Sequence, residues 1–243
     1  MLIPHAWSVD ASANSDTRRL ITVSPSLHLS GDASGATERT ISLSLDMRPT
    51  SFIHVNFGPS LDVVHGTGQY VRAVSDLLAT TTFGRHYVFA DLSQSTVAMD
   101  TRLDWTFTSE LTLQLYAQPF ISTGKYSSFK QLRAPRTYAF DEYGRDVGTI
   151  TRISSGYTID PDGAGSAPSF AIGDPNFNIR SLHGDAVLRW EYRPGSTLFF
   201  VWQQQREGFE SIGDFSFTRD AGAIFRAQPT NVFLIKVAYW MGQ

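Results

Sequence analysis

Apolar and polar residues alternate along most of the chain, which is typical of β-strands with two different faces. Between residues 97 and 107 the large apolar side chains fall mainly at odd positions and the charged ones at even positions. Residues 109–121 repeat this arrangement, as do 41–57, 186–203 and 232–240. Helical periodicity is scarce. The pattern therefore predicts an all-β, antiparallel meander built from hairpins.

The lengths of the predicted connections differ sharply. Three are tight turns, at Pro49, Thr108 and Pro194-Gly195, and two are long, at 122–179 and 207–230. A chain that crosses one layer at every strand places all three turns at one end and both long connections at the other. Short strands are also expected near 136–142 and 148–158. The ten main strands are predicted at 20–29, 39–48, 52–60, 69–77, 85–93, 97–107, 109–121, 180–193, 196–206 and 231–240.

The polar face of these strands carries whole charges in mid-strand, opposite a face of large apolar and aromatic residues. A transmembrane β-barrel has this pattern, with charges in its lumen and aromatics toward lipid. A soluble sandwich, with its apolar face as core, also explains it. Mutual ion pairing is the simplest role for the charges. The residues predicted to face a lumen are Asp100, Arg102, Asp104, Arg189, Glu191 and Arg193. Those predicted to face lipid are Trp105, Phe107, Trp190, Tyr192, Phe200, Trp202, Phe233 and Tyr239.

Loop asymmetry favours the barrel, because outer-membrane barrels combine short periplasmic turns with long outer loops. We therefore expect a transmembrane barrel of about 10–12 strands, with the chain as all of it or as the C-terminal part of a larger one. Residues 17–243 are predicted as one domain with a long outer loop at about 122–179. Residues 1–16 are predicted to be a disordered or linker segment.

Composition narrows the possible functions. Charged residues form 18% of the 243 residues and the formal net charge is −3, which argues against binding nucleic acid by phosphate neutralisation. The absence of Cys excludes disulfides and cysteine-based zinc sites. No apolar run reaches about 18 residues, so a transmembrane helix is excluded, whereas alternating strands remain compatible with a barrel. No cofactor is predicted.

The two ends of the chain add two expectations. The first ten residues have no basic region followed by an apolar run, so they are not a secretory signal. With the alternating strands, this favours a fragment of an envelope protein over a cytoplasmic protein. The aromatic pair Tyr239-Trp240 precedes three further residues, so the aromatic assembly signal that usually ends an outer-membrane barrel is displaced.

Candidate sites for chemistry are weak. Asp160 and Asp162, followed by Gly163, resemble part of a calcium loop, but the closing Glu is missing and a turn is favoured. The six His form no metal-binding pair, and no Ser or Cys is marked as a nucleophile. Tyrosines in or near the long connection, from Tyr116 to Tyr157, would suit a glycan ligand, an interface belt or loop packing equally.

Several segments resemble an uncharacterised β-barrel domain of bacterial envelope proteins. They are Arg85–Leu92, Leu113–Phe120, Tyr157–Gly163, Val201–Gln203, Asn231–Trp240 and, most specifically, the Arg-Trp-Glu-Tyr-Arg-Pro-Gly-Ser run at Leu188–Ser196. In that family the domain usually follows a carbohydrate-binding module of the family-nine type, which this chain lacks. The resemblance covers about residues 17–240 and implies no catalytic residues.

Together these observations predict a non-enzymatic outer-membrane barrel domain of unknown cargo, coupled to carbohydrate binding or uptake. Its expected partners are outer-membrane lipid, the barrel assembly machinery and a glycan. Two alternatives stay open: a soluble sandwich or barrel acting as a carbohydrate-binding accessory module, and an outer-membrane hydrolase that uses loop residues.

Overall fold

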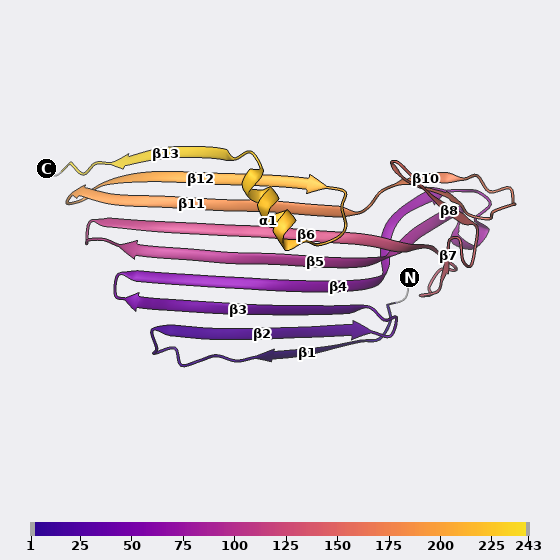
Figure 1. Ribbon diagram of the computed structural model, residues 1–243, viewed down its shortest axis with the longest axis horizontal. Helices are drawn as coiled ribbons and strands as arrows, with labels where there is room; N and C mark the ends of the chain where they lie inside the picture. The colour runs from indigo at the N-terminus through magenta and orange to yellow at the C-terminus, as the bar shows by residue number, and fades with distance from the viewer. Residues whose placement is uncertain (1–2, 242–243) are drawn as a thin grey trace.

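The computed structural model describes residues 3–241, and the predictions made for residues 1–2 and 242–243 lie outside this range. Nine long strands follow one another in a single antiparallel meander, as predicted, and β7 (Phe140–Glu142) is added beside one of them (Figure 1). In spatial order they are β1 (Ala6–Ser12), β2 (Ile21–Asp32), β3 (Thr37–Thr50), β4 (Ile53–Ser75), β5 (Arg85–Thr106), β6 (Leu111–Leu132), β11 (Phe177–Arg193), β12 (Ser196–Glu210) and β13 (Thr230–Ala238).

Two pairs of predicted strands are single strands. The predicted strands 52–60 and 69–77 are both parts of β4, and 85–93 and 97–107 are both parts of β5. The register between β4 and β5 shifts between Gly66 and Gln69, which interrupts the two-residue period without ending either strand. Merging both pairs removes two crossings of the sheet. Because this number is even, each later turn stays at the end of the sheet where it was predicted.

All the predicted tight turns lie at one end of the sheet, on the left in Figure 1. At one of them, Gly195 adopts φ +77°, and at another the Thr108 hydroxyl accepts the backbone N–H of Glu110 and of Leu111. The connection 133–176 lies at the opposite end, together with the 3-10 helix η1 (Thr80–Thr82), and the connection 211–229 joins the ends of β12 and β13 that point that way. The predicted asymmetry of the loops is confirmed; below, the two ends are the tight-turn end and the long-loop end.

The predictions for residues 1–16 and 122–179 need correction. The first segment contains β1, which pairs with β2 over its whole length, because Trp7 and Val9 continue the apolar face of the sheet. In the second, β6 continues to Leu132 and β11 begins at Phe177. Between them lie β7 and a separate three-stranded sheet of β8 (Thr149–Ile153), β9 (Gly156–Asp160) and β10 (Phe170–Gly173).

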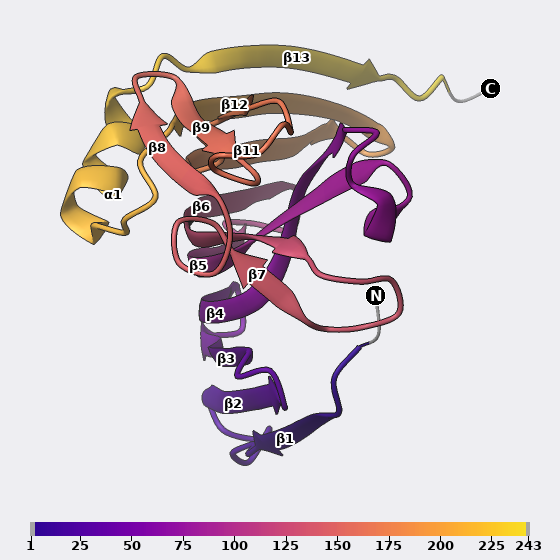
Figure 2. The same cartoon turned by 90° about the vertical axis from the view of Figure 1, so that its right-hand side faces the viewer.

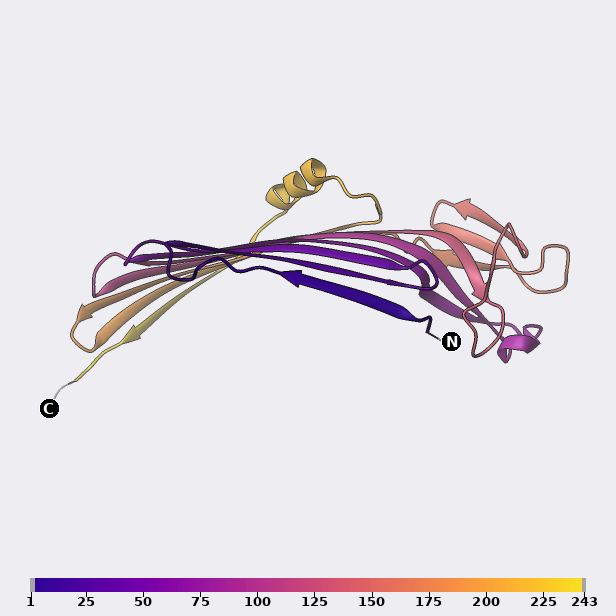
Figure 3. The same cartoon turned by 90° about the horizontal axis from the view of Figure 1, so that it is seen from below.

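The large sheet is curved, as the view along the strands (Figure 2) and the view from its β1 edge (Figure 3) show. The helix α1 (Phe217–Arg226), which joins β12 to β13, lies on the convex side of the sheet. No helix in the described residues is long and apolar enough to cross a membrane.

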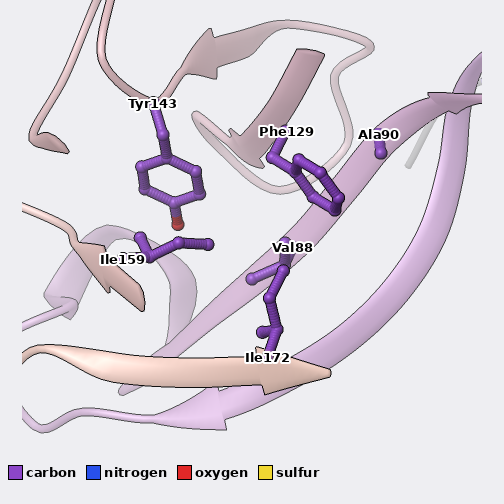
Figure 4. Close-up of a cluster of buried hydrophobic side chains, with 6 residues drawn as sticks. All are labelled: Val88, Ala90, Phe129, Tyr143, Ile159 and Ile172. Atoms are coloured by element: carbon purple, nitrogen blue, oxygen red, sulfur yellow. The ribbon is translucent and has the colours of Figure 1, made fainter. Parts of the chain in front are cut away.

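The buried apolar cluster of residues 3–241 lies at the long-loop end. There the ends of β5 and β6 pack against β7–β10, a region called the cap below. Figure 4 shows how its buried side chains meet between strands that are distant in the sequence. The cluster consists of Val88, Ala90, Phe129, Tyr143, Ile159 and Ile172.

Candidate functional site

The convex face of the large sheet is apolar across all nine strands, and strand register shows this directly. One row of paired residues crosses the sheet near the tight-turn end, from β13 to β4. Every member is apolar: Ile235, Phe200, Leu188, Leu113, Trp105 and Ile53. The apolar positions predicted on separate strands thus form one continuous surface.

A second row of pairs, nearer the long-loop end, shows that the apolar surface is a tilted band. At β12 and β11 this row contains Gly208 and the buried, charged Arg180, both outside the band. From β6 to β1 the same row is wholly apolar. Its members there are Ile121, Val97, Leu61, Ile41, Leu27 and Ala11.

The slope of the band can be estimated from the register. Its centre lies near Ile235 on β13 and near Val9 on β1. The centre of the band thus shifts by roughly ten residues, or about 33 Å, along the strand direction. Across the strands, the nine-stranded sheet is about 38 Å wide. The strands are therefore inclined by roughly 40° to the normal of the band, within the 35–45° range of membrane barrels.

Large side chains on this band are left uncovered. Phe233 is 75% exposed, Ile41 55% and Trp190 47%. A band about 40 Å wide and about 25 Å high covers roughly 1,000 Å², more than the largest apolar patch of about 300–600 Å² on soluble monomers. Within residues 3–241 the sheet β8–β10 lies at the long-loop end and does not cover the band. The exposed apolar area therefore calls for an apolar environment.

The aromatic residues predicted to face lipid gather on this convex side. Rings of Trp105 and Phe107 are 4.4 Å apart next to one tight turn, and those of Trp190 and Tyr192 are 6.2 Å apart next to another. Register places Phe200, Trp202 and Phe233 on the same face, and the rings of Trp202 and Phe233 stack in parallel. Tyr239 follows the end of β13 at the tight-turn end.

Arg193 departs from the predicted charged face. The register of β11 and β12 shifts between Glu191 and Arg193, which redirects the last residue of the strand. Its guanidinium lies over the Tyr239 ring, 5.8 Å from the centroid, and Nη1 donates to the Tyr239 hydroxyl at 3.3 Å. Arg193 thus belongs with the aromatic residues at the tight-turn end and not with Arg189 and Glu191.

The other predicted charges lie on the concave face and form a network there. His54 Nε2 lies 2.6 Å from Asp46 Oδ2, and His54 Nδ1 lies 3.8 Å from Asp104 Oδ2. Arg102 Nε lies 3.3 Å from the same Asp104 oxygen. These ion pairs connect β3, β4 and β5 near the tight-turn end of the sheet.

Hydrogen bonds extend this network to β6 and give the concave face its polar character. Asp100 accepts hydrogen bonds from the Tyr116 hydroxyl and from Gln118 Nε2, both at 2.8 Å. On β11, Arg189 Nη2 donates to Glu191 Oε2 at 2.9 Å. These charged groups find partners on the concave face itself, which is the simple role that the sequence allowed.

The cap contains a buried polar group at its centre. His86 Nε2 lies 2.9 Å from Asp76 Oδ2, and His86 Nδ1 lies 2.8 Å from Gln131 Oε1. The hydroxyl of Tyr143 donates to the same Gln131 oxygen, and burial raises the pKa of that hydroxyl. The backbone N–H of Leu78, followed by His86, lowers the pKa of Asp76. Both nitrogens of His86 are occupied, so this group holds the cap together and has no free base.

Asp160 and Asp162 make a turn. Asp160 Oδ1 accepts the backbone N–H of Gly163 at 2.9 Å, and Asp162 Oδ2 accepts that of Ala167 at 2.9 Å. Gly163 adopts φ +72°, the left-handed conformation that the turn requires. No group of three or more potential metal-binding side chains occurs in residues 3–241.

Sequence reasoning missed a second buried polar group, which anchors α1 on the convex face. Asp220 is fully buried and accepts hydrogen bonds from Asn178 Nδ2 at 2.9 Å and Arg219 Nε at 2.8 Å. Burial alone would raise the pKa of Asp220, but these bonds and the Ser216 N–H lower it. Asp220 and then Asp214 raise the pKa of Arg219. The only local signal was an Asp four residues after Ser216 in a segment with Ala and Ile.

A pH dependence is expected at the turn that follows β7. Hydrogen bonds from Arg145 and then from the Glu142 backbone lower the pKa of Asp146 to about 2. A depressed folded-state pKa gives stability that is present above the unfolded value, near 4, and lost as the pH falls toward 2. Protection factors of the amide hydrogens in residues 142–147, which are corrected for the intrinsic pH dependence of exchange, should therefore fall over that range. In D146N they should be lower at neutral pH and depend less on pH, and an unchanged profile would contradict the assignment.

The family comparison covers almost the whole chain. A family model described as a domain of unknown function, DUF5916, matches residues 1–242. The chain belongs to the DUF5916 family. Comparisons with curated proteins and with solved structures found no match. The features of this DUF5916 domain that bear on its function are the two faces of the sheet and the cap.

Proposed function

We propose that this DUF5916 chain forms part of the wall of an antiparallel β-barrel in the bacterial outer membrane. The convex face contacts the hydrocarbon of the bilayer, and the concave network around Asp104 and Asp100 faces a polar lumen. The role is that of a membrane barrel domain without catalysis. Its cargo is not specified by any residue described above.

The observation that carries this proposal is the tilted apolar band. A bilayer is one flat apolar layer, so strands that cross it at an angle must begin and end their apolar segments at shifted positions from strand to strand. The row containing Arg180 and Ile121 has this shift, being polar on β11 and apolar on β6. A sheet that is exposed only because it lacks a partner layer does not need its apolar segments to shift from strand to strand.

The two ends of the sheet support the same orientation. Tight turns at one end match the periplasmic side of an outer-membrane barrel, and the aromatic pairs beside them match an interfacial girdle. Strands β4 and β5 have 23 and 22 residues, more than the roughly 9–11 that cross a bilayer. We place their extra length and the cap outside the membrane, on the long-loop side.

The direction of the edge strands defines what the barrel needs to close. β1 and β13 are the first and ninth strands of a meander, so they run in the same direction. Antiparallel closure therefore requires an odd number of further strands between them. A second copy in the same orientation would place β13 beside β1 in parallel, so it does not satisfy this condition. In hydrocarbon the unpaired backbone groups of both edges would be costly.

Coupling to carbohydrate binding or uptake stays a prediction, as do the glycan ligand and the assembly machinery as partners. So do the two alternatives, a soluble carbohydrate-binding module and a hydrolase. None of the contacts described above favours a particular sugar or a nucleophile. The barrel is supported by the band, and these finer assignments are supported only by the resemblance and by residue composition.

Membrane fractionation and protease protection test the proposal in cells that produce the protein. We expect it in the outer-membrane fraction and resistant to extraction with alkaline carbonate. Trypsin added outside should cut in the cap, for example after Arg136, and should leave Arg19, exposed in the β1–β2 connection at the tight-turn end, uncut. Recovery of the protein in a soluble fraction, or extraction by carbonate, would contradict the proposal.

A further inference from the structure

A cavity of about 400 Å³ lies between α1 and the β11–β12 hairpin on the convex side. Three arginines from three different elements line it: Arg180 on β11, Arg206 on β12 and Arg226 at the end of α1. Ala223 and Ile224 close it on the helix side. Gly208 pairs with Arg180 and leaves room beside its guanidinium, since a Cβ there would lie 3.5 Å from Nε.

Arg180 is unusual because it is buried with unused hydrogen-bond donors. Its side chain is 5% exposed, yet Nε and Nη1 have no hydrogen-bond partner. Only Nη2 is engaged, with Glu210 Oε1 at 2.5 Å, while Nη1 lies 3.7 Å from Asp220 Oδ1. Buried donors without partners are costly, so the site is completed by an acceptor that it binds.

The charges around the cavity leave an excess of positive charge. Arg180 is paired with Glu210, and Asp220 is paired with Arg219. Arg206 uses its guanidinium on the carbonyls of Phe225 and Ala227, which satisfies the end of α1 without cancelling its charge. Glu207 also borders the cavity, but its side chain lies on the opposite face of β12. There its carboxylate accepts a hydrogen bond from Gln205.

The height of the cavity above the apolar band indicates what kind of anion reaches it. Trp202 is the last large apolar residue of the band on β12, and Arg206 lies four positions further along the same face. Four residues of strand span about 13 Å. This places the arginines just beyond the hydrocarbon edge, in the headgroup layer of the membrane position proposed above.

We propose that this cavity binds the phosphate of an anionic lipid headgroup on the long-loop side of the membrane. Guanidinium groups recognise phosphate oxygens through charge-assisted hydrogen bonds, and Arg180 Nε and Nη1 each provide a buried donor without a partner. The inference rests on the proposed function, since that function supplies the lipid. The shared chemistry is an anionic phosphate group, which a free phosphate ion also offers.

Calorimetric titration of the whole protein in dodecyl maltoside micelles distinguishes a lipid phosphate from a free phosphate ion. The two probes are dihexanoyl phosphatidic acid, which carries acyl chains, and inorganic phosphate. We expect the lipid to bind at least tenfold more tightly. R226Q removes an exposed guanidinium and should weaken lipid binding about tenfold, and A223L should do the same by filling the cavity. R19Q, an exposed arginine far from α1, is the matched control and should bind as the unchanged protein does.

Equal affinity for both probes would overturn the lipid assignment. No binding of either probe, or unchanged affinity in both R226Q and A223L, would mean that water fills the cavity and would overturn the site itself. Binding in micelles does not depend on membrane insertion. A protein that binds phosphatidic acid but fractionates as soluble would therefore contradict the proposed function and leave the phosphate site standing.

Discussion

Replacing Leu115 by arginine should prevent stable assembly of the barrel in the membrane. Leu115 lies on the convex face of β6, paired with Leu103 on β5 and Ala186 on β11, near the middle of the apolar band. A cationic side chain on the lipid face at the bilayer midplane costs about 2–4 kcal/mol. We expect L115R to be largely lost from the outer-membrane fraction, as measured by immunoblotting of separated fractions.

Two matched variants control for the added charge. Gln114 is the neighbour of Leu115 on the opposite, concave face, where it already donates to Asp104. Q114R should therefore assemble almost normally. The second variant is L111R. Leu111 lies on the convex face but at the tight-turn end of β6, where the cost of an arginine falls to about 0–1 kcal/mol. Equal loss of L115R and Q114R would contradict the assignment of the two faces.

The second large effect is expected when the carboxylate that anchors α1 is removed. Asp220 is fully buried and accepts from Asn178 and Arg219, while Arg180 lies 3.7 Å away. D220A would leave the buried Arg180 with one carboxylate in place of two. Removing one partner of a buried ion pair costs about 3 kcal/mol or more. Amide exchange in α1 should become roughly a hundredfold faster, since about 1.4 kcal/mol corresponds to tenfold.

Asp214 provides the control for this effect, because it contacts the same Arg219 at 3.0 Å but is exposed. D214N should change amide exchange in α1 by little, since exposed ion pairs contribute about 0–1 kcal/mol. D220N, which keeps the size of the side chain and loses its charge, should lie between D220A and the unchanged protein. Equal exchange rates in D220A and D214N would show that Arg180 and Asp220 do not anchor the helix.

Local alternation predicted the two faces of the sheet, because each strand's faces depend on its own residues. Leu113 and Gln114 fall on opposite faces wherever the strand is placed. The loop asymmetry followed from the same information, since Pro194-Gly195 and Thr108 mark their turns locally. The strand pairing, and with it the tilt of the band, depends on register between strands and was beyond such reasoning.

The errors have a common physical origin in single-residue irregularities and long-range contacts. A register shift after Gly66 hid the continuity of β4, and another after Glu191 turned Arg193 toward Tyr239. The strand β1 was missed because an alternation over only seven residues is a weak signal until β2 pairs with it. The anchor of α1 was missed because Arg180 and Asp220 are brought together only by folding.

The most direct test of the membrane assignment is a depth profile along one register row. The chain has no Cys, so single cysteines at Gly208, Leu61 and Ser60 can be labelled with an environment-sensitive fluorophore. The protein is studied at its natural length in isolated outer membranes. Gly208 and Leu61 belong to the same row, whereas Ser60 neighbours Leu61 on the concave face.

The tilted band predicts an apolar emission spectrum, quenched by brominated lipid, at Leu61 and an aqueous or interfacial one at Gly208. Ser60 should report water. If the labels at Leu61 and Gly208 reported the same depth, or if Leu61 reported water, the convex face would not be a band embedded in lipid.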